Sequence, residues 1–343
     1  MSVVISGTGL YTPKESISND ELVHTFNAYV DKFNEENAEA IVNGEVTALS
    51  HSGSEFIEKA SGIKSRYVMS KSDILNIDIM RPTYEERPNE QISLQAEIGV
   101  AAAKEAMKAA NKTAQDIDLI IVACAYTQRS YPAMSIEIQN TLGCGGWAFD
   151  MLVACSAATF GIINASNAIK SGTAKTVLVI NPEILSPQIN YRDRDSHFIF
   201  GDVATASIIE HESTATSDHI FKIIAEQPIT QFSNNIRSNI GYMNKCTPEN
   251  IDNIDKYFIQ QGRKVFKEVL PMVSNLISTQ MEKIGLSAGD IKRLYLHQAN
   301  INMNNFIAKK VLGRDPAAGE APIILDEYAN TSSAGCSAII LKI

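Results

Sequence analysis

Short apolar segments rich in β-branched residues alternate with helical patterns along most of this 343-residue chain. Several of the apolar segments are apolar on both faces, which is typical of parallel strands covered by crossover helices. The sequence therefore predicts an α/β fold. The predicted strands are residues 3–6, 119–123, 148–152, 176–180, 206–209, 220–225 and 294–296, and the predicted helices are residues 94–110, 156–170, 257–284 and 303–312. Pro271 predicts a kink or break in the third helix.

The order helix, turn, acidic residue and strand occurs twice, in GVAAAKEAMKAANKTAQDIDLIIVACA and in EVLPMVSNLISTQMEKIGLSAGDIKRLYLHQA. Two related βαβ halves packed back to back would explain this repeat. The polar stretch 211–218 predicts the boundary, which divides the chain into residues 1–212 and 213–343. Two polar segments, 27–53 and 69–89, are interpreted as insertions that either cover a site or decorate the surface.

Composition excludes several classes of protein. The formal charge of −9 argues against a general nucleic-acid binder, which would present a basic face. No apolar run approaches the roughly 18 residues that a membrane helix needs, and the first residues lack a basic leader and a cleavage site, so we expect a cytoplasmic protein. The cysteines predict reduced thiols because they are odd in number and scattered, and no CxxC or HxxxH pattern predicts a zinc site. They are Cys124, Cys144, Cys155, Cys246 and Cys336.

Cys155 lies between a predicted strand and a predicted helix. The helix dipole and its unpaired N–H groups favour an anion there, which predicts a thiol pKa below the usual value of about 8.5. The backbone N–H of Cys155 can also donate to an oxyanion. A single cysteine is nevertheless more often a buried and inert side chain, so a role for Cys155 as a nucleophile depends on the rest of the chain.

Two further polar residues occupy similar positions. His297 follows a predicted strand directly and precedes a helix, and Asn330 follows the apolar run APIIL. Taken alone, the histidine could be a core or surface residue, and the asparagine a turn or helix cap. Together with Cys155 they lie where open α/β sheets collect the residues of a site.

These residues carry a resemblance to a known family. Cys155 in ACSAATFGI, His297 in HQAN and Asn330 in NTSSAG resemble, in order and spacing, the Cys, His and Asn motifs of β-ketoacyl-ACP synthase III in the thiolase superfamily. Four further segments are similar, so that the resemblance covers nearly the whole chain: ISGTGLYTP, SGIKSRYV, YPAMSIEIQNTLG and IFGDVATASIIE.

The resemblance implies a thiolase-like fold, with duplicated βαβαβ halves in a five-layer α-β-α-β-α arrangement. It also implies an acyltransferase of fatty acid or related biosynthesis. Cys155 would accept an acyl group from a thioester, while His297 and Asn330 would stabilise the enolate formed as malonyl-ACP loses carbon dioxide. The resemblance implies no metal or redox cofactor. Asn300, also in HQAN, is expected in the substrate region, where it holds backbone or water.

The family also implies partners. It forms homodimers in which the segment before the nucleophile closes the partner's acyl pocket, and here that segment offers Tyr131. Acyl carrier protein docks on basic residues beside the pocket, and Lys309 and Lys310 match such positions. The alternatives are an aromatic residue in an ordinary loop and two solvated lysines. Neither a nucleic acid nor a membrane is implied as a partner.

The chain departs from the family at several positions. Members that use acetyl-CoA carry a tryptophan and an arginine where this chain has Phe56 and Ala60, and a basic residue where it has Asn302. The primer is therefore expected on CoA or on ACP, and the insertions resemble those of a subgroup that takes medium-chain primers. After NTSSAG the ending is interpreted as a helix start joined directly to the last strand, which shortens the C-terminal half. The alternatives are an acyltransferase or non-decarboxylating condensing enzyme of the superfamily, and a catalytically silent subunit that binds carrier protein.

Overall fold

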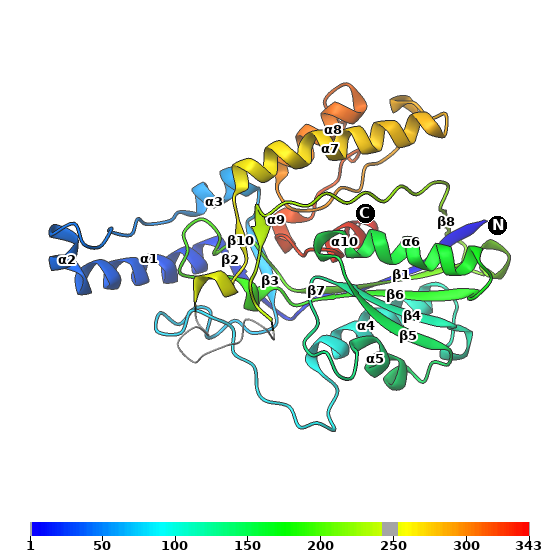
Figure 1. The fold of residues 1–343 in the computed structure, drawn as a ribbon, viewed down its shortest axis with the longest axis horizontal. Coiled ribbons are helices and arrows are strands. Elements are labelled where there is room, and N and C mark those ends of the chain that lie inside the picture. Colours follow the sequence, from blue (N-terminus) through cyan, green and yellow to red (C-terminus); the bar gives the residue numbers. More distant parts are fainter. Residues whose placement is uncertain (1, 242–252, 343) are drawn as a thin grey trace.

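The computed structural model describes residues 2–241 and 253–342, and a six-stranded mixed sheet forms its centre (Figure 1). Cys246 lies outside the described residues. The strand order is β5-β4-β6-β7-β1-β8. β5, β4 and β6 are parallel, whereas β7, β1 and β8 join by antiparallel pairing. The strands are β1 (Val3–Tyr11), β4 (Leu119–Cys124), β5 (Trp147–Leu152), β6 (Thr176–Glu183), β7 (Val203–His211) and β8 (Phe221–Lys222).

The first five predicted strands are confirmed, and β1, β6 and β7 extend several residues beyond the predicted ends. β4 and β6 are buried at every position, because both have neighbours on either side and helices over both faces. The predicted strand 220–225 contributes only the two residues of β8 at the edge.

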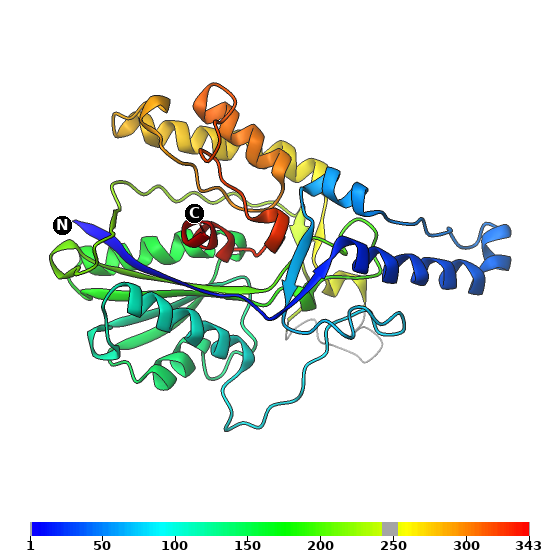
Figure 2. The ribbon, with the colours of Figure 1, turned by 180° about the vertical axis from the view of Figure 1, so that it is seen from behind.

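Helices cover both faces of the sheet (Figures 1 and 2). α4 (Leu94–Ala109) and α5 (Met134–Leu142) lie on one face, and α6 (Ala157–Lys170) and α10 (Ala334–Lys342) lie on the other. α10 corrects the prediction of a final strand at the end of the chain. The segment lies over the face of the sheet, where a strand would find no free edge, and Ala334 and Ala338, one turn apart, are both buried against β7 and its neighbours.

The remaining elements lie beyond the carboxyl ends of the parallel strands or above α6 and α10. α7 and α8 pack against each other, and α1 extends away from the sheet with α2 at its end (Figure 2). The bounds are β2 (Glu15–Ser18), α1 (Asn19–Glu36), α2 (Ala38–Val42), α3 (Ser54–Ser61), β3 (Ser65–Val68), β9 (Ile236–Arg237), β10 (Ile259–Gln260), α7 (Gly262–Lys283), α8 (Ile301–Leu312) and α9 (Leu325–Tyr328). No helix in the described part of the chain is long and apolar enough to cross a membrane.

The second sheet of the predicted five layers does not form within residues 213–241 and 253–342. The predicted strand at 294–296 has no strand partner in the described part of the chain. Leu294 N–H instead donates to Glu320 O at 2.7 Å. α7 also begins later than predicted, because residues 259–260 pair with β9 as β10. α7 continues through Pro271, which is exposed, so the carbonyl it leaves unpaired can meet water.

The crossing of β1 over α4 gives a stability prediction. A Cβ atom on Gly9 would lie 2.0 Å from the carbonyl oxygen of Ala102 and 2.5 Å from the amide nitrogen of Ala106, both backbone atoms that cannot yield without moving the helix. Gly9→Ala is expected to lower the free energy of unfolding by about 1–3 kcal/mol or more. Denaturant unfolding checks this. Gly145→Ala, which would meet no atom within 4 Å, should change stability far less; equal stabilities of the two variants would contradict the packing.

Candidate active site

Cys155 lies in a short turn between β5 and α6, as the sequence predicts. Ala154 before it adopts a φ of +45°, a left-handed conformation that L-residues rarely adopt. Ser156 N–H donates to Val153 O at 3.1 Å and closes the turn. The strained turn presents Cys155 at the N-terminus of α6, where it is exposed.

The electrostatics of the thiol differ from the prediction. Although Cys155 is exposed by surface area, the protein around its sulfur removes water and raises the pKa of the thiol to about 11. The charge of Glu183 raises it further, while the nearby hydroxyl of Ser332 lowers it. The predicted depression by the helix dipole is therefore wrong, because desolvation outweighs it. At neutral pH Cys155 is a thiol, and a base must take its proton.

Asn330 is held in a loop against the end of the sheet. Its N–H donates to Ile199 O at 3.0 Å, and its carbonyl accepts from Gly201 N–H at 3.1 Å. Its side-chain Oδ1 accepts from Ser332 N–H at 2.9 Å, and Asn330 is buried. Gly201 allows this close approach, since a Cβ there would lie 2.3 Å from Tyr328 O. The loop thus fixes both the backbone and the amide of Asn330.

His297 precedes α8, as predicted, although the segment before it is not a strand. Burial lowers the pKa of its imidazole to about 4, against the opposing effect of a hydrogen bond with the Ser332 backbone. Its Nδ1 is buried and has no hydrogen-bond partner. The His297 ring is therefore neutral at pH 7, and its Nδ1 makes no hydrogen bond within the described residues.

Ser332 brings the three predicted catalytic residues together. Its N–H holds the Asn330 side chain, its backbone faces His297, and its hydroxyl faces Cys155 without forming a hydrogen bond of ordinary geometry. Ser332 itself adopts a φ of +50°. Residues from three distant parts of the chain therefore meet around one serine that the sequence analysis did not single out, although it lies within the quoted motif NTSSAG.

Glu183, at the end of β6, is a further residue of this region that was not predicted from the sequence. Its carboxylate is completely buried and accepts hydrogen bonds from Ala125 N–H, Ser333 N–H and the Ser333 hydroxyl. Burial raises the pKa of Glu183 to about 7 despite these donors. No pattern of spacing indicates this residue, because its partners lie 58 and 150 positions away.

Phe56 and Asn300 belong to two helices that contact each other, because Phe56 lies in α3 and Asn300, at the start of α8, binds the α3 backbone. The Phe56 ring in α3 has the guanidinium of Arg194 over it, 4.2 Å from the ring centroid. Arg194 thus places a positive charge beside Phe56, although this chain has Ala60 where acetyl-CoA-using members carry an arginine. Asn300 caps α8 by accepting from Asn302 N–H at 2.8 Å, and its Nδ2 donates to Ala60 O at 2.8 Å. Both contacts of Asn300 are with the protein backbone.

The remaining predicted residues lie at the surface. Tyr131, before α5, is 85% exposed. Lys309 and Lys310 are exposed in the last turn of α8, and Lys309 pairs with Asp315 at 3.0 Å. No hydrogen bond or ion pair within residues 2–241 and 253–342 joins any of the three to the Cys155 turn.

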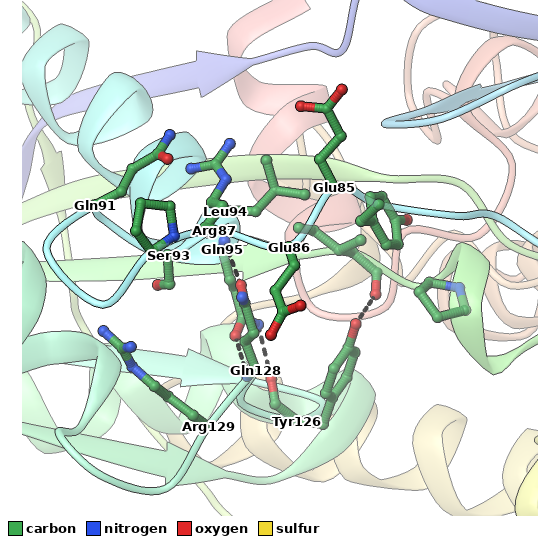
Figure 3. A pocket seen from close by; sticks show the side chains of 14 residues that line it. Glu85, Glu86, Arg87, Gln91, Ser93, Leu94, Gln95, Tyr126, Gln128 and Arg129 are labelled. Carbon is green, nitrogen blue, oxygen red and sulfur yellow. Dashed lines mark hydrogen bonds between the residues drawn. The ribbon is translucent and has the colours of Figure 1, made fainter.

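A cavity of about 440 Å³ opens beside the carboxyl ends of β4 and β6 (Figure 3). The segment 84–91 forms one wall, and Tyr126, Gln128 and Arg129 form another. Gln95 ties the walls together, because its Nε2 donates to Tyr126 O at 2.8 Å and its Oε1 accepts from Gln128 N–H at 2.6 Å. None of the described lining residues is a predicted catalytic residue.

Comparison with known families supports the reading of the motifs. Residues 149–226 match the model of 3-oxoacyl-[acyl-carrier-protein (ACP)] synthase III, and residues 281–341 match the model of its C-terminal part. The first match contains Cys155, and the second contains His297 and Asn330. The fold and these two matches together define an acyl-transferring condensing enzyme with a thiolase-like fold.

Individual relatives of this chain have names that agree with the two family matches. The chain is 52% identical over 313 residues to a β-ketodecanoyl-[acyl-carrier-protein] synthase of Pseudomonas aeruginosa, covering 91% of this chain and 89% of the relative. It is 30% identical over 299 residues to a β-ketoacyl-[acyl-carrier-protein] synthase III of Agrobacterium fabrum, covering 86% and 83%. The crystal structure of 3-oxoacyl-[acyl-carrier-protein] synthase III from Aquifex aeolicus superposes with a TM-score of 0.74 at 26% identity, over 99% of this chain and 90% of that one. The chain belongs to the β-ketoacyl-ACP synthase III family, and its predicted thiolase-like fold is confirmed.

The raised pKa of Cys155 gives a prediction for its reactivity. Because the thiolate is the reactive form, alkylation of Cys155 by iodoacetamide should continue to accelerate with pH beyond about pH 9. Peptide mass spectrometry measures the rate at Cys155 separately from the other cysteines. A rate that reaches its plateau near pH 8 or below would contradict the desolvated environment described here.

Proposed function

We propose that this chain condenses a medium-chain acyl primer with malonyl-ACP through a thioester on Cys155. The observation that carries this proposal is the meeting of Cys155, His297 and Asn330 around Ser332. Membership of the family supplies the reaction class.

The first step loads the primer. The Cys155 sulfur attacks the carbonyl carbon of the acyl thioester, the bond from that carbon to the carrier sulfur breaks, and the carrier leaves as a thiol. Because Cys155 is a thiol at neutral pH, its proton must move during this step. The neutral His297 ring is the proposed acceptor, and it returns the proton to the departing sulfur. The backbone N–H of Cys155 is the proposed donor to the oxyanion.

The second step forms the carbon–carbon bond. The bond between the malonyl carboxylate and its α-carbon breaks, carbon dioxide leaves, and the electron pair forms an enolate on the thioester. Asn330 has its Oδ1 occupied by Ser332 N–H, which leaves its Nδ2 to donate to the enolate oxygen beside His297. The enolate carbon then attacks the acyl carbon on Cys155, the bond from that carbon to the Cys155 sulfur breaks, and the sulfur leaves as a thiolate that takes a proton from solvent. The chemistry requires no metal or redox cofactor.

An eight-carbon primer is the proposed acyl substrate. The name of the relative from Pseudomonas aeruginosa specifies a ten-carbon β-ketoacyl product. A product of that length requires an octanoyl primer, since the malonyl unit contributes two carbons after decarboxylation. The Phe56 ring and the Arg194 guanidinium together offer a planar apolar and cationic surface, suited to the base and phosphates of CoA. We therefore propose octanoyl-CoA as the donor.

A homodimer would cover the exposed edge of the sheet. β5 is an edge strand, and Trp147, Phe149 and Leu152 on it remain exposed at 41%, 37% and 57%. An unpaired edge with large apolar side chains is a surface suited to pairing with a second copy. The Cys155 turn follows β5 directly, so this arrangement would bring Tyr131 of one copy towards the acyl site of the other.

Acyl carrier protein is the proposed macromolecular substrate, and Lys309 and Lys310 are the proposed docking residues. Both side chains are exposed, although Asp315 competes for Lys309. A cytoplasmic location is also proposed, supported by the four described cysteines, which are all free.

Intact-protein mass spectrometry tests the proposed intermediate. Incubation with octanoyl-CoA should add one octanoyl group to the wild-type chain and none at this position to Cys155→Ala, because the thioester forms on that sulfur. Parallel incubations with acetyl-CoA and octanoyl-ACP show which acyl length and which carrier the enzyme prefers. Absence of any mass gain with all donors would reject the synthase proposal and favour a silent carrier-binding subunit.

The homodimer has its own test. Replacing Trp147 and Phe149 together by lysine places charges on the β5 edge and should convert a dimer into a monomer, as measured by light scattering after gel filtration. Val42→Lys, at an apolar residue on α2 that is 85% exposed and lies away from β5, is the control and should leave the dimer intact. A wild-type chain that is monomeric, or a double variant that stays dimeric, would rule out this interface.

A further inference from the structure

Glu183 is a buried acidic residue that the proposed reaction does not use. It ends β6 and is 0% exposed. No ion pair recorded for residues 2–241 and 253–342 includes it. A buried carboxylate without a cationic partner is destabilising unless hydrogen bonds compensate it, so its neighbours indicate what it does.

All donors to Glu183 come from segments that border the candidate active site. Ala125, the residue after β4, donates its N–H to both carboxylate oxygens at 3.1 Å. Ser333 donates its N–H to Oε1 at 3.3 Å and its hydroxyl to the same oxygen. Glu183 therefore joins the carboxyl ends of β4 and β6 to the loop that carries Asn330. Without it, the loop retains the backbone contacts of Asn330 but loses its attachment at Ser333.

We propose that Glu183 is a positioning residue that holds the 330–333 loop in place for decarboxylation. This inference rests on the proposed function. The hydrogen bonds from Ser333 attach the loop that carries Asn330 to the carboxylate, and the hydrogen bonds from Ala125 hold the carboxylate at the ends of β4 and β6.

The positioning role is tested by separating the two chemical steps. Glu183→Ala should still load octanoyl on Cys155 but release carbon dioxide from malonyl-ACP at least about tenfold more slowly, because the loop that carries Asn330 loses its attachment at Ser333. Glu183→Gln should recover much of that rate, since its amide oxygen can still accept from Ser333. With an active wild-type chain, equal losses of loading and decarboxylation in Glu183→Ala, or no recovery in Glu183→Gln, would contradict the positioning role alone. A wild-type chain that releases no carbon dioxide would reject the proposed function.

Discussion

The attachment of the 330–333 loop to the end of the central sheet is the constraint on which the candidate site depends. Asn330 exchanges backbone hydrogen bonds with Ile199 and Gly201, and Ser333 binds Glu183. These contacts join a segment near the end of the chain to strands formed more than 100 residues earlier. Since the second half forms no large sheet in its described part, the loop takes its position from the first half.

The charge state of the site follows from burial. The pKa of Cys155 is raised and that of His297 lowered, so at neutral pH both groups are uncharged. A thiolate paired with an imidazolium would react with many electrophiles, whereas a neutral pair requires proton transfer in step with attack on a bound thioester. The site is therefore organised for a substrate that is held in place, which agrees with an enzyme that receives its substrates on carriers.

Much of the first half could be predicted from the sequence, because β4, β6 and β7 each carry a local pattern that a buried position demands. The Cys, His and Asn motifs were also visible, since each follows an apolar segment. Ser332 and Glu183 could not be predicted in this way. Their roles arise from contacts between residues far apart in the chain, and nothing in their local sequence distinguishes them from other serines and acidic residues.

Two predictions about the C-terminal half failed for physical reasons. The end of the chain forms α10 instead of a strand, because it lies over a sheet whose edges are elsewhere. The predicted strand at 294–296 lacks a neighbouring strand, and an extended segment without hydrogen-bonded neighbours is not a sheet. Both differences concern the C-terminal half, so catalysis by this chain depends on whether the Asn330 loop alone can support decarboxylation.

The most direct test is the mass of the carrier protein after wild-type enzyme is incubated with octanoyl-CoA and malonyl-ACP. The wild-type chain should produce β-ketodecanoyl-ACP. The Asn330→Ala variant should produce no β-ketodecanoyl-ACP, even though its Cys155 is still acylated. A wild-type chain that carries octanoyl on Cys155 but leaves malonyl-ACP unchanged would contradict the claim that Cys155, His297 and Asn330 form a working condensing site.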